Sequence, residues 1–563
     1  DNLPPIITIY DPACGTGGML TESQNFIKDQ NGQIKANGDI YLYGKEINDE
    51  TYAICKSDMM IKGNDPKYIL NGSTLSTDDF SGQTFHYMLS NPPYGKSWAS
   101  DQKYIKDGKD VIDPRFILNL KDYWGNKEEK DSVPRSNDGQ LLFLMEMVNK
   151  MKSTGQSPNG SRIASVHNGS SLFTGDAGSG ESNIRRYIIE NDWLECIIQM
   201  PTSLFYNTGI STYIWVLSNN KKPEWKGKVQ LIDASGRYRK LRKNLGAKNC
   251  EFAEEHIREI QDVYLNMQKA EREGEEDIAS QIFDNSDLGF YKVTIERPKR
   301  LKAQFSSENI ETLRFDPKLK EPMQWAYKEF GDKVYEDITQ FEKEIDEWCE
   351  KNDLELTKKQ HNRLFSKKLW EKHKNLVKIA NDLMQAIGTD VHNDFNVFRN
   401  KVDTYLKEQK IKLTDSEKNT ILNAVSWYDA EAEKVVKSRT KLKDEKLEKL
   451  LDHLNCEQNQ LADYGYYPTE RENEYLQYET ESDLRDYEEV PLKDDIYEYF
   501  QREVKPHVPD AWINMDATKI GYAISFNKYF YQHKPLRNLE EVTEEIKELE
   551  EASKGLIDDI ISL

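Results

Sequence analysis

The sequence predicts a doubly wound α/β domain followed by a charged, mainly helical C-terminal region. Up to about Pro298, short β-branched and apolar runs alternate with helical patterns, and the runs end in polar or glycine-rich turns. From about Asp316 to Gly465 the sequence becomes highly charged and helical in its periodicity. Over all 563 residues, 31% are charged and 37% are hydrophobic, so a sizeable share of the chain is expected to be exposed helix.

The first predicted strand, turn and helix form a candidate ligand site. The β-branched run at residues 6–10 ends in Asp11, a glycine-rich turn follows, and a helix can open at Gly18. Doubly wound sheets bind ligands beyond the carboxyl ends of their strands, and glycines let the backbone approach a ligand closely. The helix N-terminus favours a carboxylate or phosphate, whereas Asp11 favours a cation. The pattern is neither a dinucleotide motif nor a P-loop. It favours a small zwitterion that carries an amine and a carboxylate.

A second strand end carries a carboxylate. The apolar run at residues 40–44 is followed closely by Glu46. An acidic residue at the tip of the second strand is where such folds hydrogen-bond a ribose diol. A solvated surface charge is the alternative for Glu46 taken alone.

The strand-like run at residues 85–90 ends in the turn Asn91-Pro92-Pro93-Tyr94. Each proline fixes φ and has no N–H, and the residue before each proline is kept out of the helical region. The Asn91 side chain and the Pro92 carbonyl are therefore held as two acceptors beside an aromatic ring. A planar aromatic amine such as that of adenine fits this arrangement, and a proline-rich loop with a packed tyrosine is the alternative.

Together the three strand ends predict S-adenosyl-L-methionine beside an adenine. Asp11 suits the amino-acid end of the cofactor, Glu46 its ribose, and Asn91 the target amine. The motifs D-P-A-C-G-T-G-G, G-K-E-I-N and N-P-P-Y-G, in this order, resemble the amino-methylating DNA methyltransferases. Within them the chain most resembles the modification (M) subunit of type I restriction-modification systems. Later stretches are similar to the same subunit: residues 162–173, 184–190, 197–201, 204–217, 484–492, 506–512 and 520–527.

This resemblance implies a Rossmann-like, S-adenosylmethionine-dependent methyltransferase domain with a mixed, mostly parallel sheet. The implied activity is methyl transfer to the N6 amino group of a flipped adenine in DNA. Tyr94 and Phe205 are expected to stack on the base, although an ordinary core phenylalanine is the alternative for Phe205. The implied catalytic residues are Asn91, Pro92 and Tyr94. The implied cofactor-binding residues are Asp11, Pro12, Ala13, Gly15, Thr16, Gly17, Gly18 and Glu46.

Two departures from the family stand out. The third strand of the family often carries an acidic residue near residues 71–75, where this chain has Ser73. Asp78 and Asp79 lie nearby and are not assigned as ligand contacts. The cofactor motif also begins close to Asp1, whereas the family has a helical N-terminal domain before it. The chain is therefore expected to lack that domain, which supplies a cofactor-contacting segment in the family.

The net charge of −21 argues against this chain gripping DNA alone, because phosphate contacts supply most nonspecific affinity. One basic patch could contact the DNA backbone, and a solvated hairpin or loop is an equal alternative. Its cations are Arg237, Arg239, Lys240, Arg242 and Lys243. A second basic patch lies at residues 297–302. Sequence reading is therefore expected to lie in a more basic chain. The resemblance implies a specificity (S) subunit in this role, together with a second M subunit and a restriction (R) subunit.

The sequence predicts four parts. They are a methyltransferase domain at 1–315, a charged helical region at 316–465, a family-signature region at 466–535 and an amphipathic helix at 536–563. The last helix has a heptad stripe that could dock on a helical partner or pack on its own domain. Its members are Leu539, Val542, Ile546, Leu549, Leu556, Ile560 and Leu563. The tryptophans of the helical region are expected to be packing anchors of a helix bundle: Trp325, Trp348, Trp370 and Trp427.

Cysteine usage and the length of the apolar runs narrow the class of protein. Six scattered cysteines without C-x-x-C spacing predict no metal cluster and no disulfide framework, and they favour a reducing cytoplasm. The resemblance implies that this cytoplasm is prokaryotic. The apolar runs have strand length, so no membrane span is expected. The alternatives in function are methylation of cytosine or of a protein glutamine, and a noncatalytic assembly scaffold.

Overall fold

The computed structural model describes residues 6–28, 39–206, 208–272, 274, 277–531, 538–539 and 542–551. The chain divides into two compact units, which are described separately. The first unit takes residues 1–291, 491–493 and 519–563, and the second takes residues 292–490 and 494–518. The four-part division expected from the sequence follows changes in composition rather than compactness, and it stays a prediction.

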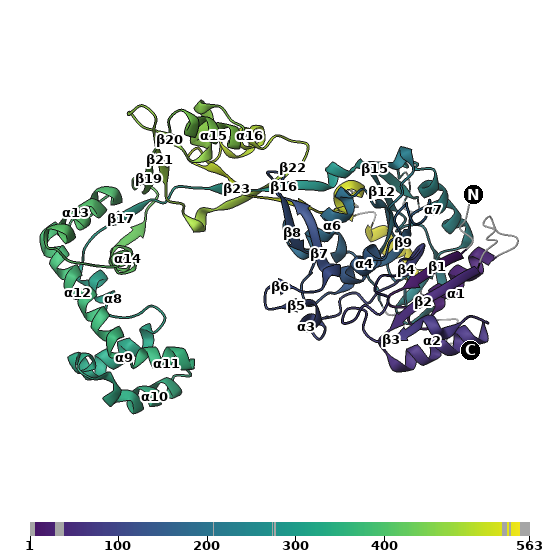
Figure 1. The fold of residues 1–563 in the computed structure, drawn as a ribbon, viewed down its shortest axis with the longest axis horizontal. Helices are drawn as coiled ribbons and strands as arrows, with labels where there is room; N and C mark the ends of the chain where they lie inside the picture. The colour runs from purple at the N-terminus through teal and green to yellow at the C-terminus, as the bar shows by residue number, and fades with distance from the viewer. Residues whose placement is uncertain are drawn as a thin grey trace. The chain divides into compact units, whose positions relative to one another are not determined.

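A nine-stranded sheet forms the centre of the first unit (Figure 1). In sheet order its strands are β15 (Ala279–Asp284), β12 (Lys228–Asp233), β10 (Leu194–Gln199), β11 (Thr212–Ser218), β9 (Arg162–Asn168), β4 (Tyr87–Ser90), β1 (Ile6–Asp11), β2 (Asp39–Glu46) and β3 (Ile69–Asn71). β11 and β15 run antiparallel to their neighbours, and all other pairs are parallel. This mixed, mostly parallel sheet confirms the predicted Rossmann-like α/β class.

The strand order reverses between β1 and β4. The chain moves from β1 outward to β2 and β3, and then returns to β4 on the other side of β1. In the parallel register Ile9 pairs with Tyr87, and Tyr10 pairs with Met88. The carboxyl ends of β1 and β4 therefore lie side by side, and doubly wound sheets bind their ligands beyond such a switch point.

Helices cover both faces of this sheet, because neighbouring residues of a buried strand point to opposite sides. Ile9 packs in one apolar cluster with Leu20 and Met59, whereas Tyr10 belongs to the cluster on the other face, with Ile184. The helices of this unit are α1 (Gly18–Lys28), α2 (Asp49–Ile61), α3 (Gln102–Ile105), α4 (Gln140–Asn149), α5 (Ser170–Phe173), α6 (Gly180–Glu190), α7 (Glu254–Leu265) and α17 (Phe526–Phe530). α1 and α2 contribute to the first cluster, and α4 and α6 contribute to the second.

Three hairpins extend the first unit. They pair β5 (Lys106–Asp107) with β6 (Asp110–Val111), β7 (Ile117–Lys121) with β8 (Lys127–Asp131), and β13 (Arg239–Leu245) with β14 (Lys248–Glu251). The first two hairpins lie in the long segment between β4 and α4. The third hairpin follows β12 and carries the basic patch that the sequence analysis identified.

The second unit is mainly helical. Its helices are α8 (Ser307–Thr312), α9 (Lys320–Phe330), α10 (Glu342–Lys351), α11 (Lys358–Leu364), α12 (Lys367–Ile387), α13 (Phe395–Glu408), α14 (Asp415–Ala424), α15 (Glu445–Leu454) and α16 (Ile496–Tyr499). The strands that follow the nine-stranded sheet are β16 (Gly289–Glu296), β17 (Leu301–Ala303), β18 (Ser426–Tyr428), β19 (Val436–Lys441), β20 (Tyr467–Pro468), β21 (Glu474–Tyr478), β22 (Asp486–Pro491) and β23 (Trp512–Tyr522). β18 and β19 interrupt the region that the sequence predicts to be helical.

The tryptophans of this unit pack as predicted at three positions. Trp370 is fully buried, and the rings of Trp325 and Trp348 stack with their centroids 5.3 Å apart. Trp427 is 38% exposed, and the prediction that it anchors a helix bundle is wrong. It lies on β18, which pairs with β17 in a two-stranded ribbon, so one face of its ring can stay open to solvent.

The predicted element ends that matter for the site are confirmed. β1 ends at Asp11, β2 ends at Glu46, β4 ends at Ser90 and α1 begins at Gly18. Residues 542–551 are helical, and Leu556, Ile560 and Leu563 of the heptad stripe lie outside the described residues. In the part of the chain that the structure describes, no helix combines the length and apolar character that a membrane crossing requires.

Candidate active site

A cavity of about 450 Å³ lies at the carboxyl ends of the four strands β1 to β4. Its wall is built from the loops that follow these strands and from the start of α4. Residues that line it include Ala13 after β1, Glu46 at the end of β2, Thr74 after β3, Asn91 after β4 and Gly139 before α4. The sheet edge at which the sequence predicts a ligand site therefore carries a cavity.

Asp11 joins the glycine loop to β4. Its carboxylate Oδ1 accepts hydrogen bonds from the Ala13 N–H at 2.9 Å and from the Ser90 hydroxyl at 2.8 Å. The side chain is buried, and burial raises the pKa of Asp11 to about 7. Asp11 is not among the lining residues, so its contacts in this structure are with the protein itself.

Glu46 organises the glycine loop from the cavity side. Its Oε2 accepts from the Gly15 N–H at 3.0 Å, and its Oε1 accepts from the Asn48 N–H at 2.9 Å. Gly17 has a φ of +81°, and a Cβ there would come within 2.8 Å of the Cys55 sulfur and 2.7 Å of the Met59 Cε. Both the backbone conformation and the lack of space therefore require glycine at this position.

The eight predicted cofactor-binding residues separate into two groups. Pro12, Ala13 and Glu46 line the cavity. The others belong to the same loop or the first turn of α1 without lining the cavity: Asp11, Gly15, Thr16, Gly17 and Gly18. Their assignment to cofactor binding stays a prediction.

The turn after β4 reaches the cavity, which neither Pro92 nor Tyr94 lines. Asn91 is exposed and lines the cavity together with Pro93, whereas Pro92 is buried. Tyr94 is half-buried, and burial raises the pKa of its hydroxyl. The backbone therefore presents the Asn91 side chain at the cavity wall, close in sequence to an aromatic ring.

Phe205 does not line the cavity. It is half-buried in the loop after β10, where it forms an isolated bridge with Thr208. β10 runs in the same direction as β4, so this loop leaves the same edge of the sheet. The structure brings Phe205 to the correct edge but not into the cavity wall, and its stacking role stays a prediction.

A carboxylate that the sequence analysis did not identify lines the cavity near the end of β3. Asp101 accepts a hydrogen bond from the Ser73 hydroxyl at 2.8 Å, and both residues belong to the cavity wall. Asp78 and Asp79 instead pair with the buried ammonium groups of Lys150 and Lys45. The only sequence signal for Asp101 is its place in the polar segment after the Asn91 turn.

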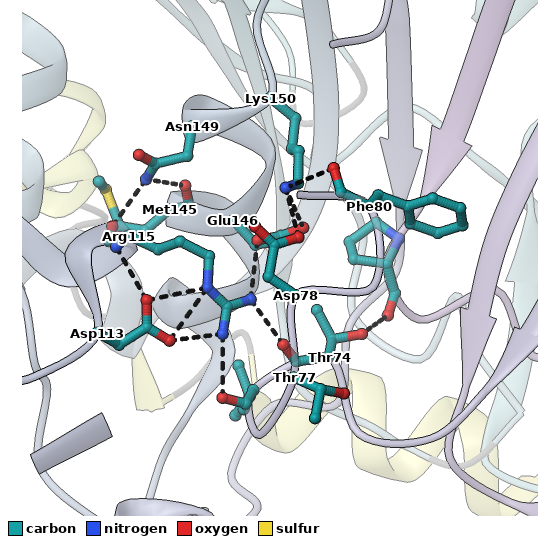
Figure 2. Close-up of polar contacts among 12 residues, drawn as sticks. Thr74, Thr77, Asp78, Phe80, Asp113, Arg115, Met145, Glu146, Asn149 and Lys150 are labelled. Carbon is teal, nitrogen blue, oxygen red and sulfur yellow. Dashed lines mark hydrogen bonds and ion pairs between the residues drawn. The ribbon is translucent and has the colours of Figure 1, made fainter. Parts of the chain in front are cut away.

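Buried cations hold the loop that follows β3 (Figure 2). The Arg115 guanidinium donates to the carbonyl oxygens of Thr74 at 2.8 Å and Leu75 at 3.2 Å, and both residues line the cavity. Burial opposes the charge of Arg115, but the carboxylates of Asp113 and Glu146 outweigh it and raise the pKa of Arg115. The part of the cavity wall formed by Thr74 and Leu75 is thus fixed by charge-assisted hydrogen bonds.

The ammonium of Lys150 holds the same loop further along. It contacts the Asp78 carboxylate at 2.5 Å and donates to the Phe80 carbonyl at 3.1 Å (Figure 2). The Thr74 hydroxyl in turn donates to the Pro12 carbonyl at 2.5 Å, which connects this loop to the cofactor motif. The sequence gives no local pattern for these contacts, because they join residues far apart in the chain.

The predicted DNA-contacting cations lie on and beside the hairpin β13–β14. Arg237 pairs with Glu259 and Arg239 pairs with Glu251, so carboxylates neutralise these two. Lys240, Arg242 and Lys243 are exposed on β13 without a carboxylate partner among the described residues. The solvated-hairpin alternative is therefore correct about the local structure, and the role in DNA contact stays a prediction.

This hairpin is fastened to the loop that carries Phe205. The Ala247 N–H donates to the Tyr206 carbonyl at 2.9 Å, and the Asn249 N–H donates to the Ser203 carbonyl at 3.0 Å. The Lys248 ammonium lies 5.2 Å from the centroid of the Tyr206 ring. Lys248 is a further cation of this surface, and it lies outside the basic run that the sequence pattern indicates.

Among the described residues, one group of side chains could hold a metal ion. It consists of Glu342, Asp346 and His361 in the second unit. The His361 Nε2 lies 3.1 Å from the nearer Asp346 oxygen and 3.8 Å from the Glu342 carboxylate. A hydrogen bond between the His361 ring and the Asp346 carboxylate accounts for the shorter contact, and the expectation of no metal stays a prediction.

The sheet order and the cavity define a doubly wound α/β protein with a ligand site at its switch point. The chain belongs to the N-6 DNA methylase family, whose model matches residues 5–288.

Among curated proteins the chain is similar to methylase subunits of type I restriction enzymes. It is 29% identical over 289 residues to the MjaIX methylase subunit of Methanocaldococcus jannaschii, which covers 51% of this chain and 44% of that protein. It is 29% identical over 230 residues to the HindI methylase subunit of Haemophilus influenzae, which covers 40% of this chain and 44% of that protein. The match therefore spans less than half the length of these relatives.

Solved structures give a weaker likeness. The type I restriction-modification methyltransferase subunit of Streptococcus thermophilus is 22% identical with a TM-score of 0.39, over 50% of this chain and 51% of that one. The fold assignment above rests on the sheet order of this chain and not on that comparison.

Proposed function

We propose that this chain transfers a methyl group from S-adenosyl-L-methionine to the N6 amino group of a flipped adenine in DNA. In this proposal it acts as the modification subunit of a type I restriction-modification complex. The observation that carries the proposal is the cavity that brings Asn91 of the N-P-P-Y turn together with Ala13 and Glu46 of the cofactor motifs. Membership of the N-6 DNA methylase family supports the reaction type.

The cavity fits the proposed cofactor in size and in chemistry. Its volume of about 450 Å³ lies in the range of small-molecule and cofactor sites. Glu46 and Asp101 provide carboxylate acceptors for hydroxyl and amine groups, and neither is neutralised by a cation among the described residues. When bound, S-adenosyl-L-methionine supplies an electrophilic methyl group on a sulfonium centre.

The acceptors of the turn explain how the chain would activate an adenine. The exocyclic amine is a poor nucleophile because its lone pair is delocalised into the ring. The Asn91 side-chain oxygen and the Pro92 carbonyl would accept its hydrogens and localise the lone pair toward the methyl donor. Tyr94 would stack on the flipped base, with Phe205 as the candidate for the opposite face. No strong base is required early, because the amine attacks as a neutral group, and positioning carries most of the rate.

DNA contact and site recognition divide between this chain and its partners in the proposal. The exposed cations Lys240, Arg242 and Lys243 would contact phosphates next to the loop of Phe205. The net charge of −21 leaves too little positive surface for tight binding by this chain alone. The specificity subunit would therefore read the site, with a second modification subunit and a restriction subunit completing the complex.

Methyl transfer from a tritiated cofactor tests this function. The chain is assayed on DNA with and without a co-expressed specificity subunit, and the labelled nucleosides are then separated. Label in N6-methyladenine only in the presence of the partner supports both the reaction and its dependence on the partner. Label in methylcytosine, in protein or nowhere contradicts the proposal.

A further inference from the structure

The Asn91–Tyr94 turn has few backbone donors with which to form stabilising hydrogen bonds. Pro92 and Pro93 have no N–H, so the turn loses two of its own backbone donors. On the upstream side, the hydroxyl of Ser90 is fixed by the Asp11 carboxylate at 2.8 Å. The conformation of the turn therefore depends on what holds its downstream end, where Gly95 follows Tyr94.

A second carboxylate holds that downstream end. The Asp138 Oδ1 accepts the N–H of Gly95 at 3.1 Å, and Gly95 has a φ of +67°, which favours glycine. Asp138 lies just before α4, where its charge interacts favourably with the helix N-terminus. The Asn91–Tyr94 turn is thus bracketed by two carboxylates, one on β1 and one at the start of α4.

Asp138 is itself fixed by a buried polar group behind it. Its Oδ2 accepts from the Gln140 Nε2 at 2.6 Å and from the Ser170 hydroxyl at 3.0 Å. Gln140 is 2% exposed, and its Oε1 accepts the Asn168 N–H at 3.1 Å. Because that oxygen is already an acceptor, Nε2 must be the donor that faces Asp138.

A buried histidine completes the support. His167 on β9 is fully buried, and its Nδ1 lies 3.1 Å from the Gln140 Oε1. Burial lowers the pKa of His167 to about 3, so the ring is neutral and Nδ1 carries its proton toward that oxygen. β9 is paired with β4, the strand from which the turn emerges. Through Gln140 and His167, Asp138 therefore fixes the turn relative to the sheet.

The backbone on either side of Asp138 also forms hydrogen bonds with the segment that comes after the turn. The Gly139 N–H donates to the Lys96 carbonyl at 3.2 Å, and the Trp98 N–H donates to the Ser136 carbonyl at 3.0 Å. The indole N–H of Trp98 donates to the Arg135 carbonyl at 3.0 Å. The two segments form a continuous contact, in which the Asp138 side chain accepts the N–H of Gly95.

We propose that Asp138 is a positioning residue for methyl transfer. It holds the N–H of Gly95, and through it the Asn91 side chain and Pro92 carbonyl, in the orientation that accepts the hydrogens of the target amine. This inference rests on the proposed function for its chemical consequence, but the geometry of the turn can be tested without turnover.

The Asp138→Ala variant is expected to lower the single-turnover rate of methyl transfer by about 100-fold, the scale of a catalytic group misplaced by about 1 Å. The Kd of the cofactor is expected to stay unchanged, because Asp138 does not line the cavity. Asp138→Asn keeps an acceptor for Gly95 but presents an N–H to Gln140. It should therefore lie between the wild type and the alanine variant, and it provides a folded variant if alanine is poorly tolerated.

A capping aspartate in the second unit provides a matched control. Asp394 accepts the backbone N–H groups of Asn396 at 2.8 Å and Val397 at 3.3 Å, and like Asp138 it is half-buried. Asp394→Ala should cost comparable stability and leave the methyl-transfer rate unchanged. An equal loss of rate in both variants would show a general loss of folded protein and overturn the proposal.

Amide hydrogen exchange separates this inference from the proposed function. In the protein without cofactor, Asp138→Ala should speed exchange at Gly95 relative to wild type, and Asp394→Ala should not. Unchanged exchange at Gly95, or an unchanged rate in an active enzyme, overturns the inference. A wild type that methylates no DNA while Asp138→Ala still speeds exchange refutes the proposed function and leaves the positioning of the turn supported.

Discussion

At the scale of single residues, the proposed chemistry depends on where three polar groups end their strands. Asn91 and Glu46 lie on the cavity wall, where Glu46 accepts from the glycine loop, and Asp11 is buried and does not line the cavity. The sequence placed all three at strand ends, which the structure confirms. What it did not predict is that Asp11 contacts Ser90 of the neighbouring strand, because that contact joins residues 79 positions apart.

Asn91→Ala should abolish methyl transfer and leave cofactor binding measurable. The change removes the side-chain acceptor of the proposed target amine, whereas the cofactor motifs at Ala13 and Glu46 remain. Turnover is measured by methyl incorporation and binding by calorimetry. Asn119→Ala, an exposed position on β7, is the matched control and should behave as wild type. Wild-type turnover in the Asn91 variant would contradict the assignment.

The buried Asp11 predicts a pH-dependent stability. Its pKa in the folded protein is about 7, above the value of about 3.9 for an unfolded aspartate. Between these values the folded chain holds a proton that the unfolded chain has released, so this stabilisation is complete below about pH 4 and is lost as the pH rises through about 7. The loss amounts to a few kcal/mol at most, at about 1.4 kcal/mol per pKa unit.

Urea unfolding across this pH range measures the effect. Asp11→Asn keeps an oxygen acceptor and stays neutral, so its unfolding midpoint should lack the decline that the wild type shows between about pH 4 and pH 7. The exposed Glu22→Gln is the control and should follow the wild type. Parallel curves for wild type and Asp11→Asn would contradict the prediction.

At the scale of elements, two loops at the carboxyl edge of the sheet are positioned by segments far from them in sequence. Arg115, which follows the β5–β6 hairpin, holds the loop after β3, and the β13–β14 hairpin holds the loop after β10. The strands themselves could be predicted from β-branched runs, because strand formation is governed by local pattern and burial. The contacts of Arg115 and of the β13–β14 hairpin that hold these loops could not be predicted, since contacts between distant residues have no local sequence signature.

Arg115→Met should destabilise the first unit by about 3–5 kcal/mol, the usual cost of removing one partner from a buried ion pair. The change leaves the Asp113 carboxylate without its cation, the Glu146 carboxylate with only the Lys150 ammonium at 3.9 Å, and the Thr74 carbonyl without its donor. Denaturant unfolding measures the loss. Arg258→Met breaks an exposed pair with Glu254 and should cause little change. Equal midpoints for the two variants would contradict the buried role.

The hairpin predicts a change in the salt dependence of DNA binding. Alanine at Lys240, Arg242 and Lys243 should reduce the slope of log K against log salt by about 0.9 for each phosphate that is no longer neutralised, or about 2.7 in total. Binding is measured with the complex that contains the specificity subunit. A matched control carries alanine at the exposed Lys358, Lys359 and Lys368 of the second unit, which changes the net charge equally. Equal slopes in both variants would exclude the hairpin from the interface.

At the scale of the whole molecule, net charge and exposed apolar surface are the features that bear on the proposed assembly with other chains. The net charge is −21, and the described part of the C-terminal helix leaves Leu539, Ile546 and Leu549 exposed. The sequence analysis left open whether this stripe packs on its own domain or on a partner. Val542 of the same stripe is half-buried, and docking of the stripe on a partner stays a prediction.

Ile546→Asp should weaken association with a co-expressed specificity subunit without changing the fold of this chain. A charge in an apolar helical seam opposes burial against a partner, whereas the residue is 58% exposed in the chain alone. Co-purification and far-ultraviolet circular dichroism measure the two effects. Lys547→Ala, next to it on the helix, should retain the partner. Undiminished co-purification of the Ile546 variant would contradict docking through this stripe.

The sequence by itself determined the class of the fold and the position of the site. Periodicity located the strands, and Asp11, Glu46 and Asn91 at their ends indicated a methyl donor beside an amine, because strand ends in a doubly wound sheet converge on one edge. Tertiary structure decided which groups line that edge and what holds them. Asp101, Arg115 and Asp138 reach the site from the segment between β4 and α4. Their roles come from hydrogen bonds across the fold, which no local pattern in the chain encodes.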